Sequence, residues 1–564
     1  NNFATLNPLE GEADPGVFSE GNLKLTSTAG NDGGSRSSLG MNSGKWYFEF
    51  SVSAISGTIP SFIGVASEDV SLSSWNNGTL VAYESESGNK RINTTGSSYG
   101  DAFGVGDVIG VAVDMDALDV TFYKNNASQG TLTDCLTAGK TYFSYTGDSS
   151  SVRSATSTIN FGQDSSFAGA KTAQGNADSG GVGDFYYAPP SGYKALCTKN
   201  LPSVDVIPSE NFNTVLWTGT TGYDRDITGI GFDPSLVWIK SRTNTYEFLW
   251  FDKVRGAGER LMTHNTNAES TNASTLNAFI TDGFTLGNGS GVDLSVNGNT
   301  SKTYASWNWK GPSGSGSSNT DGTLTSTVSA NVAAGFSIAS YTGSGSATSF
   351  GHGLSSAPEM VVIKNRDAND NWVVFHLSLS SSSAPAPYIL LTNAAAVTGS
   401  SRRFRYGDDN DGVVPDSTKV YIGSGEEVNT SNEKYIAYCF HSVDGYSKFG
   451  RYDGNAGSNE VDGTFVFTGF RPAFVMCKLT TSAGESWLIK DNKRSPFNPA
   501  DEFIYANLSN SEATGATTTA LLRDIDLLSN GFKFKGWSTE LNGDGEDYIY
   551  MAFAETPLKY ANAR

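Results

Sequence analysis

Histidine and serine are the first residues to consider for chemistry, because they supply many catalytic bases, nucleophiles and metal ligands. No two of the four histidines have the HxH, HxxxH or HExxH spacing that brings two imidazoles to one metal ion: His264, His352, His376 and His441. No GxSxG appears between a strand and a helix, and no phosphate-binding P-loop with GK[ST] follows a strand. Gly-Ser stretches such as Gly311–Gly316 are typical of linkers. We therefore expect loop histidines and no catalytic centre.

Two acidic loops have carboxylates close enough in sequence to share a ligand: Asp408, Asp409 and Asp411, and Asp544, Glu546 and Asp547. Both lie among glycine and asparagine, which favours solvated turns. Oxygen-rich loops also suit a hard cation, so a structural Ca²⁺ ion is the one cofactor considered, although neither loop has EF-hand spacing. A third interpretation is a glycosidase pair, which needs two carboxyls about 5–10 Å apart in a cleft.

The densest basic cluster is segment 402–406, which contains Arg402, Arg403 and Arg405. A cluster of this kind either docks an acidic glycan or a neighbouring subunit, or forms a solvated strand with salt-bridge partners. The second interpretation is favoured, because most surface charges have such partners nearby.

Aromatic side chains in loops are the natural tools of a glycan-binding protein, because rigid amphipathic rings stack on sugars. The candidates are Trp75, Tyr83, Tyr99 and Tyr145 in the first third of the chain, and Tyr223 and Tyr246 further on. Core or edge packing is the favoured role for any single one, whereas the group indicates binding.

The composition favours an all-β protein with many turns. The chain has 564 residues, of which 38% are hydrophobic, 17% are charged and 64 are glycine. Glycine, asparagine, aspartate and serine supply the backbone conformations that tight turns need. The net charge of −20 repels phosphate backbones, so nucleic acid is a poor partner.

Membrane and redox signals are weak. No apolar run approaches 18 residues, so no membrane insertion is expected, and no secretory signal is visible at the start. The four cysteines are far apart and form no CxxC motif, so we expect single buried thiols instead of a disulfide framework: Cys135, Cys197, Cys439 and Cys477.

Residues 1–166 contain alternating strand patterns with a predicted hairpin at 106–126. The order of Gly44–Glu49, Ile63–Val65, Gly106–Gly110, Asp119–Asn125 and Asn160–Gly162 resembles the SPRY (B30.2-like) family over about 30–165. The resemblance implies a bent β-sandwich that binds partners through loops at one end. Residues 167–207, which contain Gly, Ser and Pro, are predicted to be a linker; part of this stretch resembles marine phage structural proteins.

The remainder of the chain repeats itself. A proline and a lysine stand six residues apart in Pro234–Lys240, Pro358–Lys364 and Pro472–Lys478, each around an apolar run, and other aromatic landmarks keep the same register. We expect the run to be buried and the lysine to turn outward. The pattern predicts three copies of one domain: 208–316, 317–447 and 448–564. The copies resemble a domain of unknown function that is common in marine phage structural proteins.

The sequence therefore predicts a SPRY-like bent β-sandwich followed by three tandem, jelly-roll-like β-sandwiches. The favoured function is a non-enzymatic phage virion protein, a tail fibre or tail-attached receptor-binding protein that assembles in the host cytoplasm. Its partners would be other virion proteins and a host glycan or surface protein, in a homo-oligomer with a trimer favoured. The alternatives are a capsid decoration, head fibre or tail adaptor protein, a polysaccharide-degrading tail enzyme, and a bacterial surface adhesin.

Overall fold

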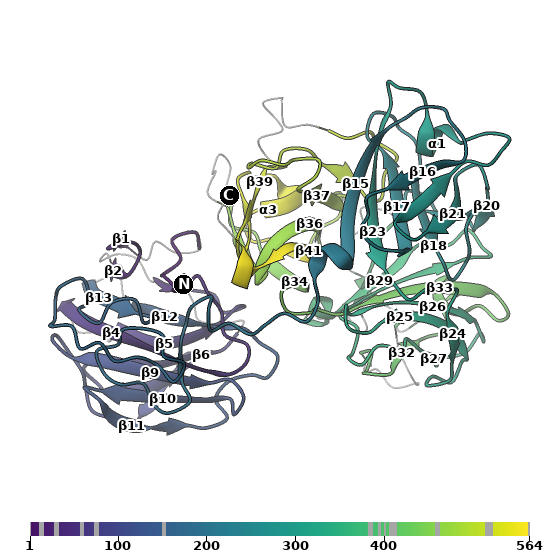
Figure 1. The fold of residues 1–564 in the computed structure, drawn as a ribbon. Helices are drawn as coiled ribbons and strands as arrows, with labels where there is room; N and C mark the ends of the chain where they lie inside the picture. Colours follow the sequence, from purple (N-terminus) through teal and green to yellow (C-terminus); the bar gives the residue numbers. More distant parts are fainter. Residues whose placement is uncertain are drawn as a thin grey trace. The chain divides into compact units, whose positions relative to one another are not determined.

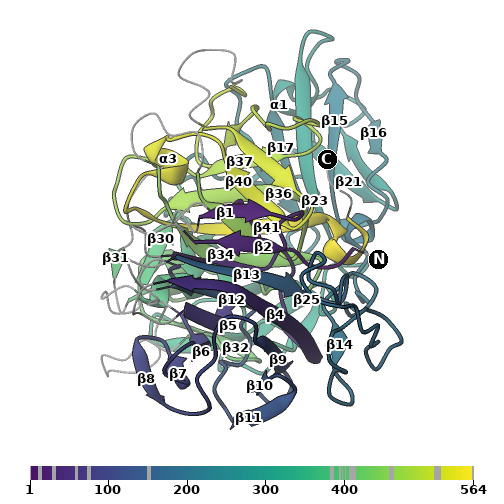
Figure 2. The ribbon, with the colours of Figure 1, turned by 90° about the vertical axis from the view of Figure 1, so that its left-hand side faces the viewer.

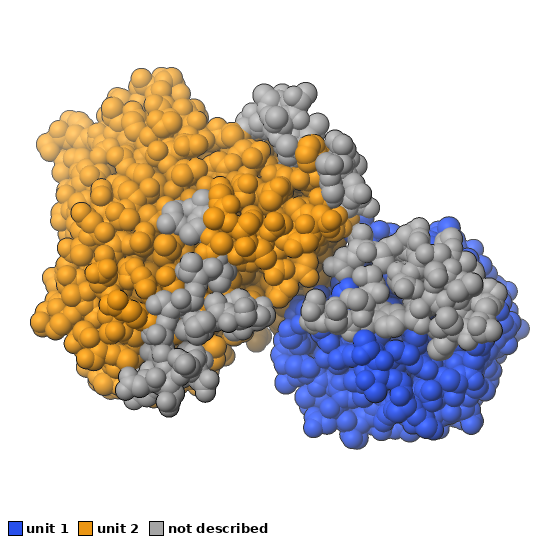
Figure 3. Space-filling view, turned by 180° about the vertical axis from the view of Figure 1, so that it is seen from behind, with its two compact units in different colours: residues 1–203 blue, residues 204–564 orange. Residues whose placement is uncertain are grey.

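The computed structural model describes residues 2–10, 16–27, 33–56, 61–72, 78–148, 154–381, 387–392, 396, 398–399, 402–404, 414–456, 463–513 and 523–561. The chain forms two compact units, Asn1–Ser203 and Val204–Arg564, which we call unit 1 and unit 2 (Figure 3). Both are built almost entirely of strands, which confirms the all-β fold class. No helix in the described ranges is long and apolar enough to cross a bilayer.

Unit 1 is a sandwich of two antiparallel sheets (Figure 2). The larger has the order β1 (Val17–Ser19), β2 (Lys24–Thr26), β13 (Ser154–Asn160), β4 (Lys45–Ser56), β9 (Val108–Asp114), β10 (Asp119–Lys124) and β11 (Ala127–Leu132), with β14 (Lys194–Ala195) beside β4. The smaller has the order β3 (Gly33–Arg36), β12 (Tyr142–Asp148), β5 (Ser61–Ser67), β6 (Leu80–Glu84), β7 (Asn89–Ile92) and β8 (Thr95–Ser98).

The predicted hairpin is confirmed. Strands β9 and β10 pair from Asp114 opposite Asp119 to Ile109 opposite Lys124. Leu118 occupies the turn with a φ of 63°, a left-handed conformation that lets the chain reverse within a few residues.

The prediction of a linker at 167–207 is wrong for most of its length. Strand β14 pairs in parallel with β4, and Phe185, Ala195 and Cys197 are fully buried against Tyr47. These apolar side chains cover a sheet face that would otherwise be exposed to water, while the glycines and serines between them form turns. Residues 167–203 therefore belong to the folded body of unit 1.

Unit 2 contains three pairs of sheets in chain order, which we call the first, second and third sheet pairs (Figure 1). In the first, the large sheet is β15 (Phe212–Thr218), β23 (Thr303–Lys310), β17 (Pro234–Ser241), β18 (Phe248–Asp252), β19 (Glu259–Met262) and β20 (Ser270–Thr271). Its small sheet is β16 (Arg225–Thr228), β22 (Gly283–Leu286) and β21 (Leu276–Ile280), and α1 spans Leu294–Asn297.

The second and third sheet pairs follow the same plan. The second is β24 (Ser317–Asn319), β25 (Ser326–Asn331), β26 (Phe336–Thr342), β33 (Lys434–Phe440), β28 (Met360–Asn365), β29 (Val373–His376), β30 (Pro387–Leu390) and β31 (Thr398–Gly399), facing β27 (Thr348–Gly351) and β32 (Lys419–Ile422), with α2 at Glu426–Asn429. The third is β34 (Ser447–Asp453), β41 (Asp547–Pro557), β36 (Phe470–Leu479), β37 (Leu488–Asp491) and β38 (Ile504–Tyr505), facing β35 (Phe465–Phe467), β40 (Gly531–Phe534) and β39 (Ile525–Leu528), with α3 at Thr539–Asn542.

Each sheet pair has an apolar core of its own, and the three large sheets also share a fourth core between them. The stacked rings of Phe212 and Phe553 join the first and third sheets at 5.0 Å between centroids. Trp250 meets Trp372 of the second sheet at 4.9 Å, and Phe440 meets Phe553 at 6.2 Å. Each large sheet therefore contacts both others, and unit 2 is one body.

The four thiols of the chain are unpaired, as predicted. Cys197, Cys439 and Cys477 are buried, whereas Cys135 is half-buried.

Replacing Phe185 by alanine tests whether the 167–203 segment stabilises unit 1. We expect a loss of about 3–5 kcal/mol in the free energy of unfolding of unit 1, because a buried phenylalanine leaves a cavity. Denaturant unfolding of the full chain measures it, with Ser191→Ala in the exposed part of the segment as the control. A change below about 1 kcal/mol for Phe185→Ala would contradict the packing described here.

Candidate functional site

A tyrosine hydroxyl closes a short helix at the same place in each sheet pair of unit 2. The hydroxyl donates to a carbonyl at the start of the helix and accepts from the backbone N–H just after it. In the first sheet pair Tyr304 donates to the carbonyl of Leu294 and accepts from the N–H of Gly298. The corresponding residues are Tyr435, Glu426 and Thr430 in the second sheet pair, and Tyr548, Thr539 and Gly543 in the third. Each tyrosine, the second residue of its central strand, thus ties the beginning of that strand to the adjoining loop.

The last residue of each helix is a fully buried asparagine: Asn297, Asn429 and Asn542. Its side-chain oxygen accepts from a loop N–H that follows β15, β26 or β34, and its amide donates to a carbonyl. The N–H residues are Thr220, Ser344 and Asn455, and the carbonyl residues are Gly222, Gly423 and Gly536. The amide therefore replaces backbone partners that an irregular loop lacks.

A glycine precedes each of these loops, at Gly219, Gly343 and Gly454. A Cβ there would lie 2.2, 2.2 and 2.1 Å from a backbone carbonyl oxygen, too close for any side chain. The loop and the helix end therefore approach as closely as the backbone allows. Together the three contacts fix the loops at one end of each sheet pair, as a binding surface requires.

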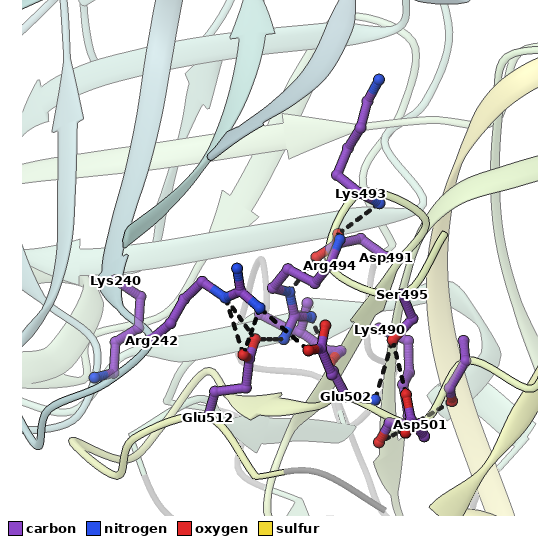
Figure 4. A network of polar contacts seen from close by, with 12 residues as sticks. Lys240, Arg242, Lys490, Asp491, Lys493, Arg494, Ser495, Asp501, Glu502 and Glu512 are labelled. Atoms are coloured by element: carbon purple, nitrogen blue, oxygen red, sulfur yellow. Dashed lines mark hydrogen bonds and ion pairs between the residues drawn. The ribbon is translucent and has the colours of Figure 1, made fainter. Parts of the chain in front are cut away.

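The seam between the third and first sheet pairs is a buried charge network (Figure 4). Arg494 donates to Asp491 at 2.5 Å and to Glu512 at 3.1 Å. Arg242 donates to both oxygens of Glu512, at 2.9 and 3.0 Å, and Trp307 donates its indole N–H to Asp491 at 3.0 Å. Every charge thus has a partner, as a buried ion needs, and the contacts Arg242–Glu512 and Trp307–Asp491 cross the seam.

The seam between the first and second sheet pairs repeats this arrangement. Arg255 donates to Asp252 at 2.5 Å and to Glu269 at 3.1 Å. Arg366 donates to both oxygens of Glu269, at 2.9 and 2.6 Å, and the hydroxyl of Tyr438 donates to Asp252 at 2.8 Å. These networks hold the sheets in register and are not arranged around a ligand.

The three lysines at the strand ends are buried, so the prediction that they turn outward is wrong. Lys240, Lys364 and Lys478 have no exposed surface, and burial lowers the pKa of each to about 8. Each ammonium donates to backbone carbonyls of the turn after its strand, at Ser241, Asn365 and Leu479 among others. The lysines satisfy carbonyls that lose their partners where the strands end.

The aromatic candidates of unit 1 are less exposed than expected. Tyr83 and Tyr145 lie on central strands of the smaller sheet with no exposed surface, so their predicted place in exposed loops is wrong. The Tyr83 hydroxyl donates to the Asp101 carbonyl. Tyr99 is half-buried and its hydroxyl donates to a backbone carbonyl, while Trp75 lies outside the described residues.

Of the remaining candidates, Tyr223 is 55% exposed and Tyr246 is half-buried. Tyr223 lies in the loop that Asn297 fixes. Arg402 is exposed. Arg403 forms a salt bridge with Glu427 and lies 5.0 Å from the ring centre of Tyr388, which fits the interpretation of a cluster with salt-bridge partners. Arg405 lies outside the described residues.

Of the two acidic loops, the structure describes the one that contains Asp544, Glu546 and Asp547. Asp544 is exposed, Glu546 accepts from Thr481, and Asp547 lies 3.4 Å from Arg451. Across the described ranges, no group of three His, Cys, Asp or Glu side chains is placed to hold a metal ion. The other loop lies outside the described residues: Asp408, Asp409 and Asp411.

The buried carboxylate of Glu49 anchors the final segment of unit 1. It accepts from the backbone N–H groups of Tyr186 and Tyr187, at 2.9 and 2.8 Å, and from Tyr47 and Asn160. Burial raises the pKa of Glu49 to about 7, and these hydrogen bonds oppose the rise. Four donors surround this carboxylate and the final segment of unit 1 packs over it, so we assign it a structural role.

A cavity of about 20 Å³ lies between the two sheets of unit 1, lined by Leu25, Val52, Ile63, Phe103 and neighbouring serines and threonines. It has room for one water molecule. It is therefore too small for a sugar or a cofactor.

Comparison with known proteins identifies both units. The family profile described as "Domain of unknown function (DUF7483)" matches residues 207–557, and the profile "SPRY domain" matches residues 45–164. The SPRY resemblance of unit 1 is thereby confirmed. No curated protein matches the chain.

Solved SPRY structures are among the similar folds. The SPRY domain of human HERC1 is 21% identical, covers 27% of this chain and 96% of its own, and gives a TM-score of 0.22. Stonustoxin is 18% identical over 28% of this chain and 27% of its own, with a TM-score of 0.22. A human SPRY domain is 16% identical over 25% of this chain and 92% of its own, with a TM-score of 0.21.

Replacing Glu512 by glutamine tests the charge network of the third–first seam. The change leaves Arg242 and Arg494 without their shared counter-charge, and we expect unit 2 to lose about 3 kcal/mol of unfolding free energy. Denaturant unfolding at neutral pH measures this loss. Glu259→Gln, a half-buried residue of β19 that accepts only from Thr271 among the described contacts, is the control. Equal stability of the two variants would refute a stabilising network.

Proposed function

The chain belongs to the DUF7483 family through residues 207–557, and from this premise we propose that it is a phage virion structural protein. In this proposal it is a tail fibre or tail-attached receptor-binding protein, located on the virion. It binds host surface glycans or envelope proteins and cleaves no bond in them.

The observation that carries the proposal is the set of loops fixed at one end of each sheet pair. A loop held by a buried asparagine, a tyrosine hydroxyl and a close glycine contact is ordered before a ligand arrives, so binding costs less conformational entropy. One such loop presents Tyr223, which is 55% exposed and follows Thr220 and Thr221 and precedes Asp224. A rigid aromatic face among hydrogen-bonding groups suits a sugar ring.

We also propose that unit 2 consists of three diverged copies of one domain, at 208–316, 317–447 and 448–564. The predicted proline–lysine register agrees with the strand order, since the strands that begin near these prolines are β17, β28 and β36, each next to the last long strand of its pair. The recurring tyrosine, asparagine and glycine contacts support the same conclusion. Three weak sites on one body would bind a glycan-coated surface with avidity.

Unit 1 adds a second binding module in this proposal. A SPRY domain implies partner recognition through loops, and other virion proteins are the partners we propose for it. The net charge of −20 disfavours nucleic acid at either unit. A homo-oligomer, with a trimer favoured, would multiply the sites further.

Binding of the purified full chain to intact candidate host cells tests the function. We expect saturable binding, and we expect Tyr223→Ala to weaken it about tenfold, the equivalent of about 1.4 kcal/mol for one lost stacking contact. Titration with the fluorescently labelled protein gives both affinities.

Tyr560→Ala is the matched control, because Tyr560 is 58% exposed and lies outside these loops. Absence of saturable binding, together with stable association with other virion proteins, would replace receptor binding by a capsid-decoration or adaptor role. Equal affinity of the two variants would exclude Tyr223 from the binding surface and leave the rest of the proposal in place.

A further inference from the structure

Among the residues that the structure describes, the seam between the second and third sheet pairs has no counterpart of the charge networks of the other two. The strand register defines the equivalent positions: Asp252 pairs with Leu236, His376 with Met360, and Asp491 with Phe474. Each of these partners stands two residues after the repeated proline. A histidine thus takes the place of the aspartate in the second sheet pair.

The other members of the network are also replaced there. Arg255 and Arg494 follow their aspartates by three residues, and the residue three after His376 is Leu379, which is buried in the shared core. Trp307 and Tyr438, which donate to the two aspartates, correspond to Met551 on β41, which has no donor. Among the described residues this seam therefore depends on apolar packing, on the imidazole, and on the Trp487 indole N–H, which donates to the Leu390 carbonyl at 2.9 Å.

His376 is 1% exposed and is bonded on both ring nitrogens. Its Nε2 donates to the Tyr550 carbonyl across the seam at 3.3 Å, and its Nδ1 accepts from the Ser378 N–H at 3.2 Å. These bonds fit a neutral ring with its proton on Nε2. A second proton would have to enter at Nδ1, against the N–H of Ser378, and would break that bond.

The neighbouring elements offer no counter-charge to a protonated ring. Burial lowers the pKa of His376 to about 4, and the Tyr550 carbonyl only partly opposes this. No ionisable side chain in the described part of these elements contributes to the pKa shift of His376. The side chains on these elements are Glu359 and Lys364 at β28, Tyr388 on β30, Lys448, Arg451 and Asp453 on β34, and Asp547, Tyr548, Tyr550 and Glu555 on β41. The Glu359 carboxylate is already bonded to Ser442.

We propose that the seam between the second and third sheet pairs is an acid-sensitive joint, which opens when a proton enters His376 at Nδ1, breaks the bond from Ser378 and leaves a buried positive charge without a counter-charge between the two sheets. The two seams with arginine–carboxylate networks stay closed, so acid loosens unit 2 at one place. The direction of the pH effect follows from the linkage between protonation and opening. The pKa of an exposed histidine is near 6.5, so the closed seam is stable above that pH and loses stability as the pH falls toward 4.

Hydrogen exchange of the full chain at pH 7.5 and pH 4.5, corrected for the intrinsic rate at each pH, tests the joint. In the wild type we expect opening to increase on the order of fiftyfold in peptides that cover 372–381 and 547–554. Peptides that cover 248–263 in the first–second seam should change far less. In His376→Asn, whose side chain does not titrate, the increase at 372–381 and 547–554 should disappear.

His352→Asn is the matched control. His352 is also fully buried, with Nε2 on the Asp416 carbonyl and Nδ1 accepting from Leu354, but these bonds lie within the second sheet pair. This variant should keep the acid response of the seam, and loss of that response would overturn the proposal. So would an equal acid response in wild type and His376→Asn, or parallel opening of the first–second seam. If His376→Asn is poorly folded, His376→Gln provides the same comparison.

Discussion

The large sheets of unit 2 have two apolar faces, and both must be removed from water. Every residue of β17, β18, β28 and β29 is buried, which is unusual for an antiparallel sheet, where one face normally meets solvent. One face of each sheet is covered by its own small sheet. The other can be covered only by the remaining large sheets, and this need produces the shared core of tryptophan, phenylalanine and tyrosine.

Closure around that core brings polar groups into the seams. Apolar contacts alone are non-directional and would allow the sheets to slide. In two seams the paired arginines and carboxylates fit together in only a narrow range of geometries, because Arg366 and Arg242 each donate to both oxygens of one glutamate. We interpret these networks as the elements that set the register of the sheets, at a desolvation cost that their hydrogen bonds offset.

The sequence was informative where the pattern is local. Alternation predicted the 106–126 hairpin, and the proline–lysine register placed equivalent strands in all three sheet pairs. Contacts between distant residues were not predictable: Arg242 and Glu512 are neighbours only because two sheets meet. A missed signal was the Asp-x-x-Arg spacing shared by Asp252–Arg255 and Asp491–Arg494. Lys240 and Phe185 were misjudged because charge and glycine-rich surroundings normally indicate exposure, and no local pattern shows which backbone carbonyls need a donor or which sheet face needs a cover.

In the first and third sheet pairs the first strand of the large sheet lies beside the last long strand, as β15 with β23 and β34 with β41. The second sheet pair has β26 beside β33 in the same way, after the two additional strands β24 and β25. The first and last of these paired strands are thus adjacent, roughly 4.8 Å apart. Insertion or deletion of one sheet pair would leave the path of the chain through the other two unchanged, because the strands at which the chain is joined are already adjacent. The fourth core limits this freedom, because removal of one sheet pair would expose to water the aromatic side chains that the three large sheets now bury together.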